Sequence, residues 1–234
     1  MITLPVYKTG DKYTIRPSKI IALGLNYVEH IKESTEDAAN KSVEIPPEPI
    51  LFAKTPNVLI GPEEPILIPA FISSYDFKPP RTDYEAELAL IVKDTCKNVP
   101  EDKVWDYIYG FTCMNDVSQR NIQLSDKSGW FRGKSFDTFG PIGPQIVLTK
   151  DLPDVQKLHI ECRVNGKVMQ SASTADMIFS ISATISFISR NLTLNAGDII
   201  MTGTPSGVGP LSAGDVVEVE VEKIGVLRNP VKAE

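Results

Sequence analysis

The stretch from Asp83 to Val92 constrains the fold most strongly, because it joins a strand pattern to a pair of acidic residues. It reads DYEAELALIV, is apolar toward its end and contains neither glycine nor proline, which is typical of a β-strand. Side chains alternate across a strand, so Glu85 and Glu87 are expected on the same face. Asp116 follows a second apolar run, at a predicted strand end where functional side chains are often displayed.

Such carboxylates repel one another when they are enclosed. At about 4 Å and an effective dielectric near 20, the repulsion between two of them is of order 4 kcal/mol. A buried cluster therefore needs protons, basic partners or a divalent cation, and oxygen-only ligands favour Mg²⁺, Mn²⁺ or Ca²⁺ over zinc. The alternative is a strand with one solvated face, and residues 217–222 (VEVEVE) alternate in the same way with no evident chemistry.

Length and charge restrict the class of protein. A chain of 234 residues is expected to form a single catalytic domain (1–234), in which 1–19 could be a small strand appendage. The net charge of −6 offers no basic surface for nucleic acid, and neither a signal peptide nor a membrane-spanning segment is predicted. The three cysteines form no CxxC pair, which favours reduced core residues and a cytoplasmic protein.

The pattern along the chain predicts many short strands and few helices. Isoleucines at 178, 181, 185 and 188 predict one clear helix, and Asn165-Gly166 is a strong hairpin signal. There is no alternating βαβα rhythm, no GxGxxG motif and no phosphate-binding loop. We therefore expect a mixed, β-rich α+β roll or sandwich with a few peripheral helices.

The chain has only two histidines, His30 and His159. His159 lies on the polar face of an alternating strand and is expected at the surface. His30 and Glu33 are three residues apart in a predicted helical turn, so Glu33 could orient the imidazole, although a surface helix histidine is the simpler interpretation. Two histidines cannot build a three-histidine metal site, which again directs any metal toward carboxylates.

Two further segments could bind an anion. Residues 202–209 (TGTPSGVG) combine glycines with hydroxyl side chains, so their N–H and O–H groups could hold a carboxylate; the alternative is a tight turn. Lys134 offers an ammonium, although with Asp137 it could be an ordinary surface pair. The polar segment 34–47 is expected to be a mobile loop.

Six blocks of sequence, in order, resemble the fumarylacetoacetate hydrolase family, including its isomerase/decarboxylase branch that handles homoprotocatechuate breakdown products. The blocks are Gly24-Leu25-Asn26-Tyr27-x-x-His30-x-x-Glu33, Tyr84-Glu85-Ala86-Glu87-Leu88, Asn115-Asp116-Val117-Ser118, Arg120, Gly133-Lys134-Ser135-Phe136-Asp137, and Thr202-Gly203-Thr204-Pro205-x-Gly207-Val208-Gly209. Each block alone is weak evidence for the family, but the ordered series is specific for it and extends from about residue 20 to the C-terminus.

The resemblance implies a β-roll of the family type, a homodimer, and Mg²⁺ or Mn²⁺ in the site, with Ca²⁺ as a substitute. It assigns roles to ten residues: Glu85, Glu87 and Asp116 as metal ligands, His30, Glu33 and Lys134 in catalysis, and Tyr27, Arg120, Gln123 and Thr204 in substrate binding. The polar loop after Glu33 would be a lid.

The implied substrate is a small keto or enol dicarboxylic acid. The resemblance favours hydrolysis of a C–C bond in 2,4-dioxo acids such as acylpyruvates, with His30 activating water. The alternatives are isomerisation of hydroxymuconate- or hydroxyheptadienedioate-type acids, tautomerisation or decarboxylation of oxaloacetate, and a non-catalytic carboxylate-binding module. Two departures bear on the substrate: Leu25 replaces a common arginine, and Asn121 a frequent aspartate.

Overall fold

The computed structural model describes residues 2–36, 44–127 and 129–234, and its described part is dominated by β-structure. The strands form a sheet of seven, a sheet of five, a sheet of three and a two-stranded hairpin. In spatial order, the seven-stranded sheet contains β4 (Ile50–Lys54), β3 (Ile20–Gly24), β14 (Ile199–Met201), β8 (Ala86–Val92), β9 (Ile108–Asn115), β11 (Gly140–Leu148) and β5 (Leu59–Ile60).

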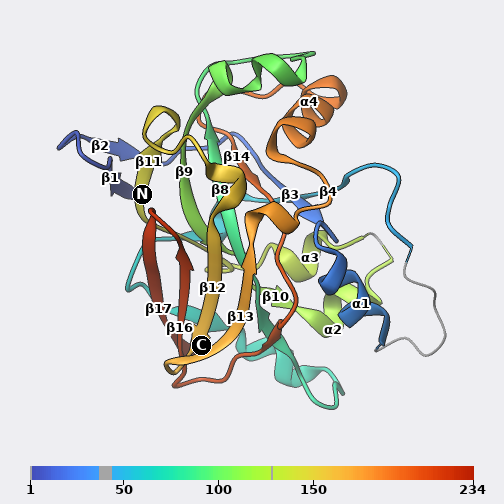
Figure 1. The fold of residues 1–234 in the computed structure, drawn as a ribbon. Helices are drawn as coiled ribbons and strands as arrows, with labels where there is room; N and C mark the ends of the chain where they lie inside the picture. The colour runs from blue at the N-terminus through green and yellow to red at the C-terminus, as the bar shows by residue number, and fades with distance from the viewer. Residues whose placement is uncertain (1, 37–43, 128) are drawn as a thin grey trace.

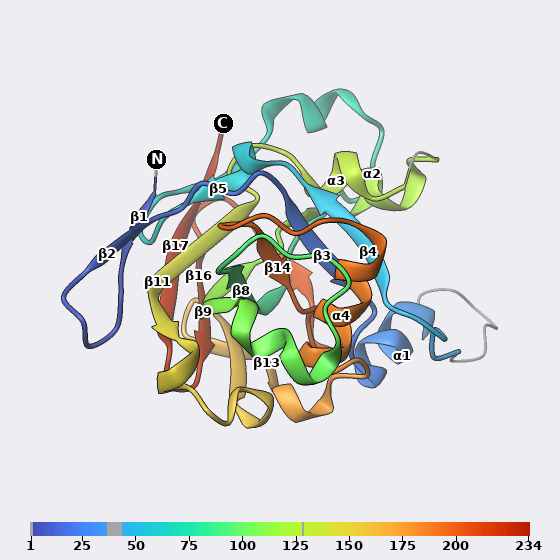
Figure 2. The same cartoon turned by 90° about the horizontal axis from the view of Figure 1, so that it is seen from above.

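The five-stranded sheet packs across β8 and β9, so these two strands lie at the centre of the molecule (Figure 1). Its order is β13 (Lys167–Ser173), β12 (His159–Val164), β16 (Val216–Val221), β17 (Gly225–Ala233) and β6 (Ile66–Ile68). The small sheet is β10 (Ser118–Gln119), β7 (Thr82–Tyr84) and β15 (Gly209–Pro210), and β1 (Thr3–Pro5) pairs with β2 (Lys12–Thr14). The β1–β2 hairpin projects from one side (Figure 2).

The helices of the described ranges lie outside the sheets, as expected for this fold class. The α-helices are α1 (Val28–Glu36), α2 (Arg120–Ser125), α3 (Phe131–Lys134) and α4 (Ile181–Asn191). The 3₁₀ helices are η1 (Pro56–Val58), η2 (Ala70–Ser74), η3 (Glu101–Tyr107), η4 (Thr149–Asp151), η5 (Val155–Lys157) and η6 (Thr174–Asp176). None of these helices has the length and apolar character that a membrane crossing requires.

Local sequence explains α4 and the β12–β13 hairpin. The Ser180 hydroxyl accepts a hydrogen bond from the Ala183 N–H at the start of α4. Ile181, Ile185 and Ile188 are buried as predicted, whereas Ile178 precedes the helix and is half-buried. Asn165 and Gly166 have φ angles of 52° and 79°, the left-handed conformation that a two-residue hairpin turn requires.

Strand β11 includes two prolines. Pro144 lies where the pairing with β9 is interrupted, between Gly143 and Val147, and Pro141 precedes the first β9 pair, Ile142 with Met114. Within the expected mobile loop, residues 34–36 belong to α1, while 37–43 lie outside the described residues.

Candidate active site

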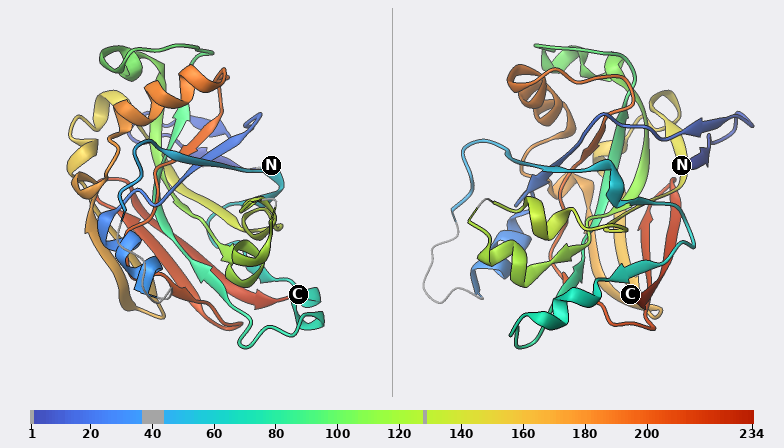
Figure 3. Two further views of the ribbon diagram at one scale, coloured as in Figure 1. Left: turned by 90° about the vertical axis from the view of Figure 1, so that its right-hand side faces the viewer. Right: turned by 180° about the vertical axis from the view of Figure 1, so that it is seen from behind.

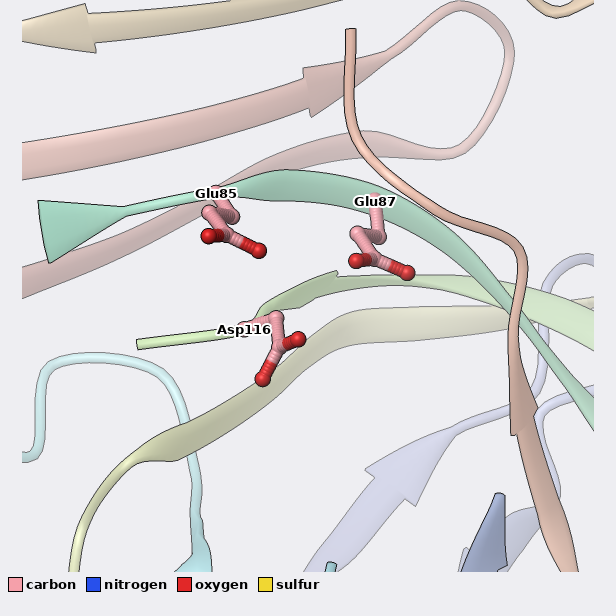
Figure 4. A group of neighbouring side chains, drawn as sticks. All are labelled: Glu85, Glu87 and Asp116. Carbon is pink, nitrogen blue, oxygen red and sulfur yellow. The ribbon is translucent and has the colours of Figure 1, made fainter. Parts of the chain in front are cut away.

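The register of β8 against β9 brings the three predicted carboxylates together. Ala86 is opposite Asn115 at the end of this ladder, and the Asp116 N–H donates to the Glu85 carbonyl oxygen at 2.8 Å. One oxygen from each of Glu85, Glu87 and Asp116 lies within 4.8 Å of the other two, and Figure 4 shows the side chains converging. All three side chains are buried, which excludes the alternative of a solvated strand face.

Three cationic side chains contact this acidic cluster. Lys134 Nζ lies 2.7 Å from Glu85 Oε2 and 2.7 Å from Asp116 Oδ2. Lys54 Nζ lies 2.5 Å from Asp116 Oδ1, and Arg120 donates to Glu85 Oε1 at 2.5 Å. Lys134 is thus part of the cluster, and the alternative of a surface pair with Asp137 is wrong, because Asp137 instead accepts a hydrogen bond from Asn57.

The surrounding charges separate the pKa values of the cluster. Burial raises the pKa of Glu85, but Lys134 and Arg120 outweigh it and hold that pKa well below its usual value. Burial, together with the charges of Asp116 and Glu85, raises the pKa of Glu87. Burial lowers the pKa of Lys134, but Asp116 and Glu85 reverse this and raise it, so Lys134 is an ammonium at neutral pH.

The donor set fits a divalent cation. Glu87 Oε2 accepts a hydrogen bond from the Gly203 N–H, whereas the buried Glu87 Oε1 has no hydrogen-bond partner among the described residues. An orphaned buried carboxylate oxygen is costly unless a cation or proton satisfies it. Together with oxygens of Glu85 and Asp116, it forms the kind of oxygen-only set that hard divalent ions prefer.

His30 and Glu33 form the pair predicted from their spacing in α1. The His30 Nδ1 lies 3.2 Å from Glu33 Oε2, and the imidazole is buried, not on the helix surface. Both Glu33 oxygens also accept from the Gly207 N–H at 3.1 Å, which ties α1 to the 202–209 loop. Burial opposes ionisation of Glu33, but these hydrogen bonds from His30 and Gly207 outweigh it and lower its pKa.

One cleft of about 160 Å³ is lined by six of the ten residues that the resemblance singles out: His30, Glu85, Arg120, Gln123, Lys134 and Thr204. Its lining comes from β3, β4, Glu85, α1, α2, α3 with the preceding Trp130, and the 202–209 loop. Figure 3 (left) shows the ribbon of α1 (blue) apart from those of α2 and α3 (yellow-green). The polar lining residues are His30, Ser34, Glu85, Arg120, Gln123, Lys134 and Thr204. The apolar ones are Leu23, Gly24, Leu25, Phe52, Leu124 and Trp130.

The predicted substrate-binding residues divide between two cavities. Arg120, Gln123 and Thr204 line the cleft, but the Arg120 guanidinium is already bonded to Asp83, Glu85 and Gln123. Tyr27 lies against a separate hollow of about 340 Å³, and its buried hydroxyl has no hydrogen-bond partner among the described residues. His159 is half exposed on β12, as predicted.

Sequence reasoning missed Lys54, which ends β4 and whose side chain has no exposed surface. A lysine after an apolar run usually marks the solvent-facing end of a strand. The available signal was indirect: an enclosed group of three carboxylates requires basic partners, and a lysine at the end of an apolar strand is a candidate for one.

A β-rich fold with a buried carboxylate cluster, a buried ammonium and a histidine–carboxylate pair beside one cleft has the groups of an enzyme that uses acid–base chemistry. The family model described as fumarylacetoacetate (FAA) hydrolase C-terminal matches residues 19–232, and the chain belongs to this enzyme family.

Relatives are found among proteins of several kinds. An uncharacterised protein of Archaeoglobus fulgidus is 49% identical over 213 residues, covering 91% of this chain and 78% of that protein. The mitochondrial oxaloacetate tautomerase of Xenopus laevis is 41% identical over 224 residues, covering 92% and 66%. The crystal structure of 5-carboxymethyl-2-hydroxymuconate delta-isomerase from Mycobacterium smegmatis superposes with a TM-score of 0.82 at 37% identity, covering 97% and 84%.

Proposed function

We propose that this enzyme is a Mg²⁺-dependent tautomerase of small 2-oxo dicarboxylic acids of the oxaloacetate type. The observation that carries the proposal is the single cleft that His30, Glu85 and Lys134 line together. Glu33 is bonded to His30, and Glu87 and Asp116 lie beside Glu85 in the carboxylate cluster. Tautomerisation needs one group that moves a proton between carbon and solvent, and a positive environment for the developing oxyanion. The names of the similar tautomerase and isomerase support the same class of reaction.

Each element of the site has a part in this reaction. When the enol form becomes the keto form, C3 gains a proton and the oxygen on C2 loses one; His30, oriented by Glu33, would exchange the C3 proton. Two N–H groups of Lys134 are used by Glu85 and Asp116, which leaves one for the substrate oxygen. A divalent ion held by Glu85, Glu87 and Asp116 would supply Lewis acidity toward the keto acid oxygens.

Hydrolysis of a C–C bond in acylpyruvates is the second candidate function. The same His30–Glu33 pair is the arrangement that activates a water molecule, which is the observation that favours it. The small cleft and its apolar wall at Leu25, where acylpyruvate-cleaving relatives commonly carry arginine, favour tautomerisation.

The deciding experiment follows enol oxaloacetate by its ultraviolet absorbance with Mg²⁺ and with EDTA. The expected result is metal-dependent ketonisation well above the buffer rate, with no release of CO₂ and no cleavage of acetylpyruvate or fumarylpyruvate. Cleavage of an acylpyruvate without faster ketonisation would establish the hydrolase instead, and CO₂ release at the rate of substrate loss would establish a decarboxylase.

We also propose a homodimer. Phe71 and Tyr75 are 44% and 40% exposed, and they form one surface aromatic cluster with Phe77 and Phe136. Exposed aromatic clusters of this kind are typical of protein interfaces. Light scattering is expected to give twice the chain mass, and Phe71→Asp to lower it; a monomeric wild type would contradict the proposal.

The free, buried cysteines support a reducing compartment such as the cytoplasm.

A further inference from the structure

Gln170 is a buried amide in an otherwise exposed part of β13. Its neighbours Lys167, Val168, Met169 and Ser171 are exposed, whereas Gln170 is 1% exposed. Burying a side-chain amide is unfavourable unless its hydrogen-bonding groups are satisfied. The contacts of this amide therefore indicate why it is inside the protein.

Three hydrogen bonds fix the orientation of the Gln170 amide. Its Oε1 accepts from the Ala86 N–H at 2.9 Å, and its Nε2 donates to the Pro205 carbonyl oxygen and to Thr204 Oγ1, both at 2.8 Å. A backbone N–H can only donate and a carbonyl can only accept, so the amide cannot be reversed. Both amide hydrogens are used, and the Thr204 hydroxyl must act as the acceptor.

The direction in which the Thr204 hydroxyl can donate a hydrogen bond follows from this arrangement. Because Oγ1 accepts from Gln170, its own hydrogen is directed elsewhere, and no other described residue accepts it. Thr204 lines the cleft that contains His30 and Lys134. The same amide holds Ala86, which lies between the cluster residues Glu85 and Glu87, and so links the loop to the acidic cluster.

We propose that Gln170 is a positioning residue that turns the Thr204 hydroxyl into an obligatory hydrogen-bond donor toward a carboxylate in the cleft. The inference rests on the proposed function insofar as that carboxylate belongs to the substrate. A carboxylate that remains an anion throughout the reaction is held equally in the ground and transition states, so loss of this bond raises KM and leaves kcat nearly unchanged.

Four variants test the inference. Gln170→Met removes the amide while keeping its length. Gln170→Glu keeps an acceptor for the Ala86 N–H but obliges the Thr204 hydroxyl to donate to the new carboxylate, away from the cleft. Thr204→Val removes the hydroxyl, and Thr204→Ser retains it as the matched control.

Binding of malonate, a dicarboxylate that does not react, is measured by calorimetry in the presence of Mg²⁺, and oxaloacetate ketonisation is measured beside it. A hydrogen bond to a charged group corresponds to about a tenfold change in affinity. We expect about tenfold weaker malonate binding and about tenfold higher KM in both Gln170 variants and in Thr204→Val, with Thr204→Ser close to wild type. In Thr204→Val, adding Gln170→Met should weaken binding no further.

Independent, multiplicative effects of the two substitutions would overturn the inference, because Gln170 would then act only on the fold. Unchanged malonate affinity in the Gln170 variants, or no malonate binding by the wild type, would overturn it as well. If neither Gln170 variant folds, equal affinities of Thr204→Val, Thr204→Ser and wild type overturn it. A wild type that binds malonate but does not tautomerise oxaloacetate contradicts the proposed function alone. The malonate affinities of the variants then still test the role of Gln170.

Discussion

Lys54 Nζ lies 2.5 Å from Asp116 Oδ1, and neither side chain has exposed surface. Without Lys54, Asp116 keeps only one of its two cationic partners, Lys134, and removing a member of a buried ion pair costs about 3 kcal/mol or more. Lys54→Met is therefore expected to lower the free energy of unfolding by about 3 kcal/mol in EDTA. It should also enlarge the stabilisation by Mg²⁺, because the cluster then carries one positive charge fewer. Chemical denaturation with and without Mg²⁺ measures both effects.

Lys19→Met is the matched control for Lys54→Met. Lys19 pairs with the buried carboxylate of Asp198, remote from the acidic cluster in the sequence, and is itself partly exposed. This variant should lose stability while its response to Mg²⁺ stays that of the wild type. Equal Mg²⁺ responses in all three proteins would show that Lys54 does not act on the carboxylates proposed to bind the metal.

Glu87→Gln tests whether the orphaned oxygen is a metal ligand. Burial and the charges of Asp116 and Glu85 already disfavour ionisation of Glu87, so the neutral amide should not lower the melting temperature in EDTA. Mg²⁺ affinity and ketonisation are expected to fall by about 100-fold or more, since even outer-shell changes reduce metal affinity by 10- to 100-fold. Glu220→Gln, on the half-exposed β16, is the control. Undiminished Mg²⁺ binding by Glu87→Gln would contradict the ligand set.

His30→Asn should reduce ketonisation by roughly 10²- to 10⁴-fold, the range for losing a general acid–base group. Mg²⁺ binding, followed by calorimetry, should change little because the hydrogen bond of the His30 imidazole is to Glu33, and among the described residues it has none to the acidic cluster. His159→Asn changes a half-exposed histidine on β12 and should be silent in both assays. Wild-type turnover in His30→Asn would remove the histidine from the mechanism.

Asp198 makes the free energy of unfolding depend on pH, and the sign of this dependence follows from its contacts. Burial raises its pKa, but hydrogen bonds from Lys19, the Asn195 N–H and Ser18 outweigh it and lower the pKa in the folded protein. This stabilisation is complete above the unfolded-state pKa of about 3.9 and is lost as the pH falls through the lower folded pKa. Asp198→Asn should lower the unfolding free energy by about 2 kcal/mol at neutral pH.

The difference between Asp198→Asn and wild type should shrink as the pH falls below about 4. Urea denaturation across the acid range measures it. Asp102→Asn, a change at a side chain that is 76% exposed, should show no such pH dependence. A constant difference across the range would mean that the charge of Asp198 does not contribute.

The sequence predicted the acidic cluster well because period-two alternation and the resemblance both placed Glu85 and Glu87 together. Alternation alone could not distinguish β8 from β16. The two strands differ in position: β8 lies between β14 and β9 and is covered by the second sheet, so all its residues are buried, whereas β16 alternates between buried and half-exposed residues. Position within a sheet depends on distant segments and leaves little local signal.

Residues that support the site from other strands were harder to predict. Lys54 and Gln170 are 62 and 84 positions from the residues that they contact at Asp116 and Ala86. Neither residue belongs to a periodic pattern or a motif. Each is buried because segments distant in the sequence cover it in the folded protein. The pairing of His30 with Glu33 was predictable because the two residues lie within one turn of the same predicted helix.

The hydrogen bonds between Glu33 and the Gly207 N–H have a consequence for the working cycle. They join α1, which carries His30, to the 202–209 loop, which carries Thr204, so neither segment can be displaced alone without breaking these bonds. Under the proposed function, release of a carboxylate from the loop and reorientation of the imidazole would therefore be linked, and a carboxylate ligand retained on the loop would also hold the imidazole in place.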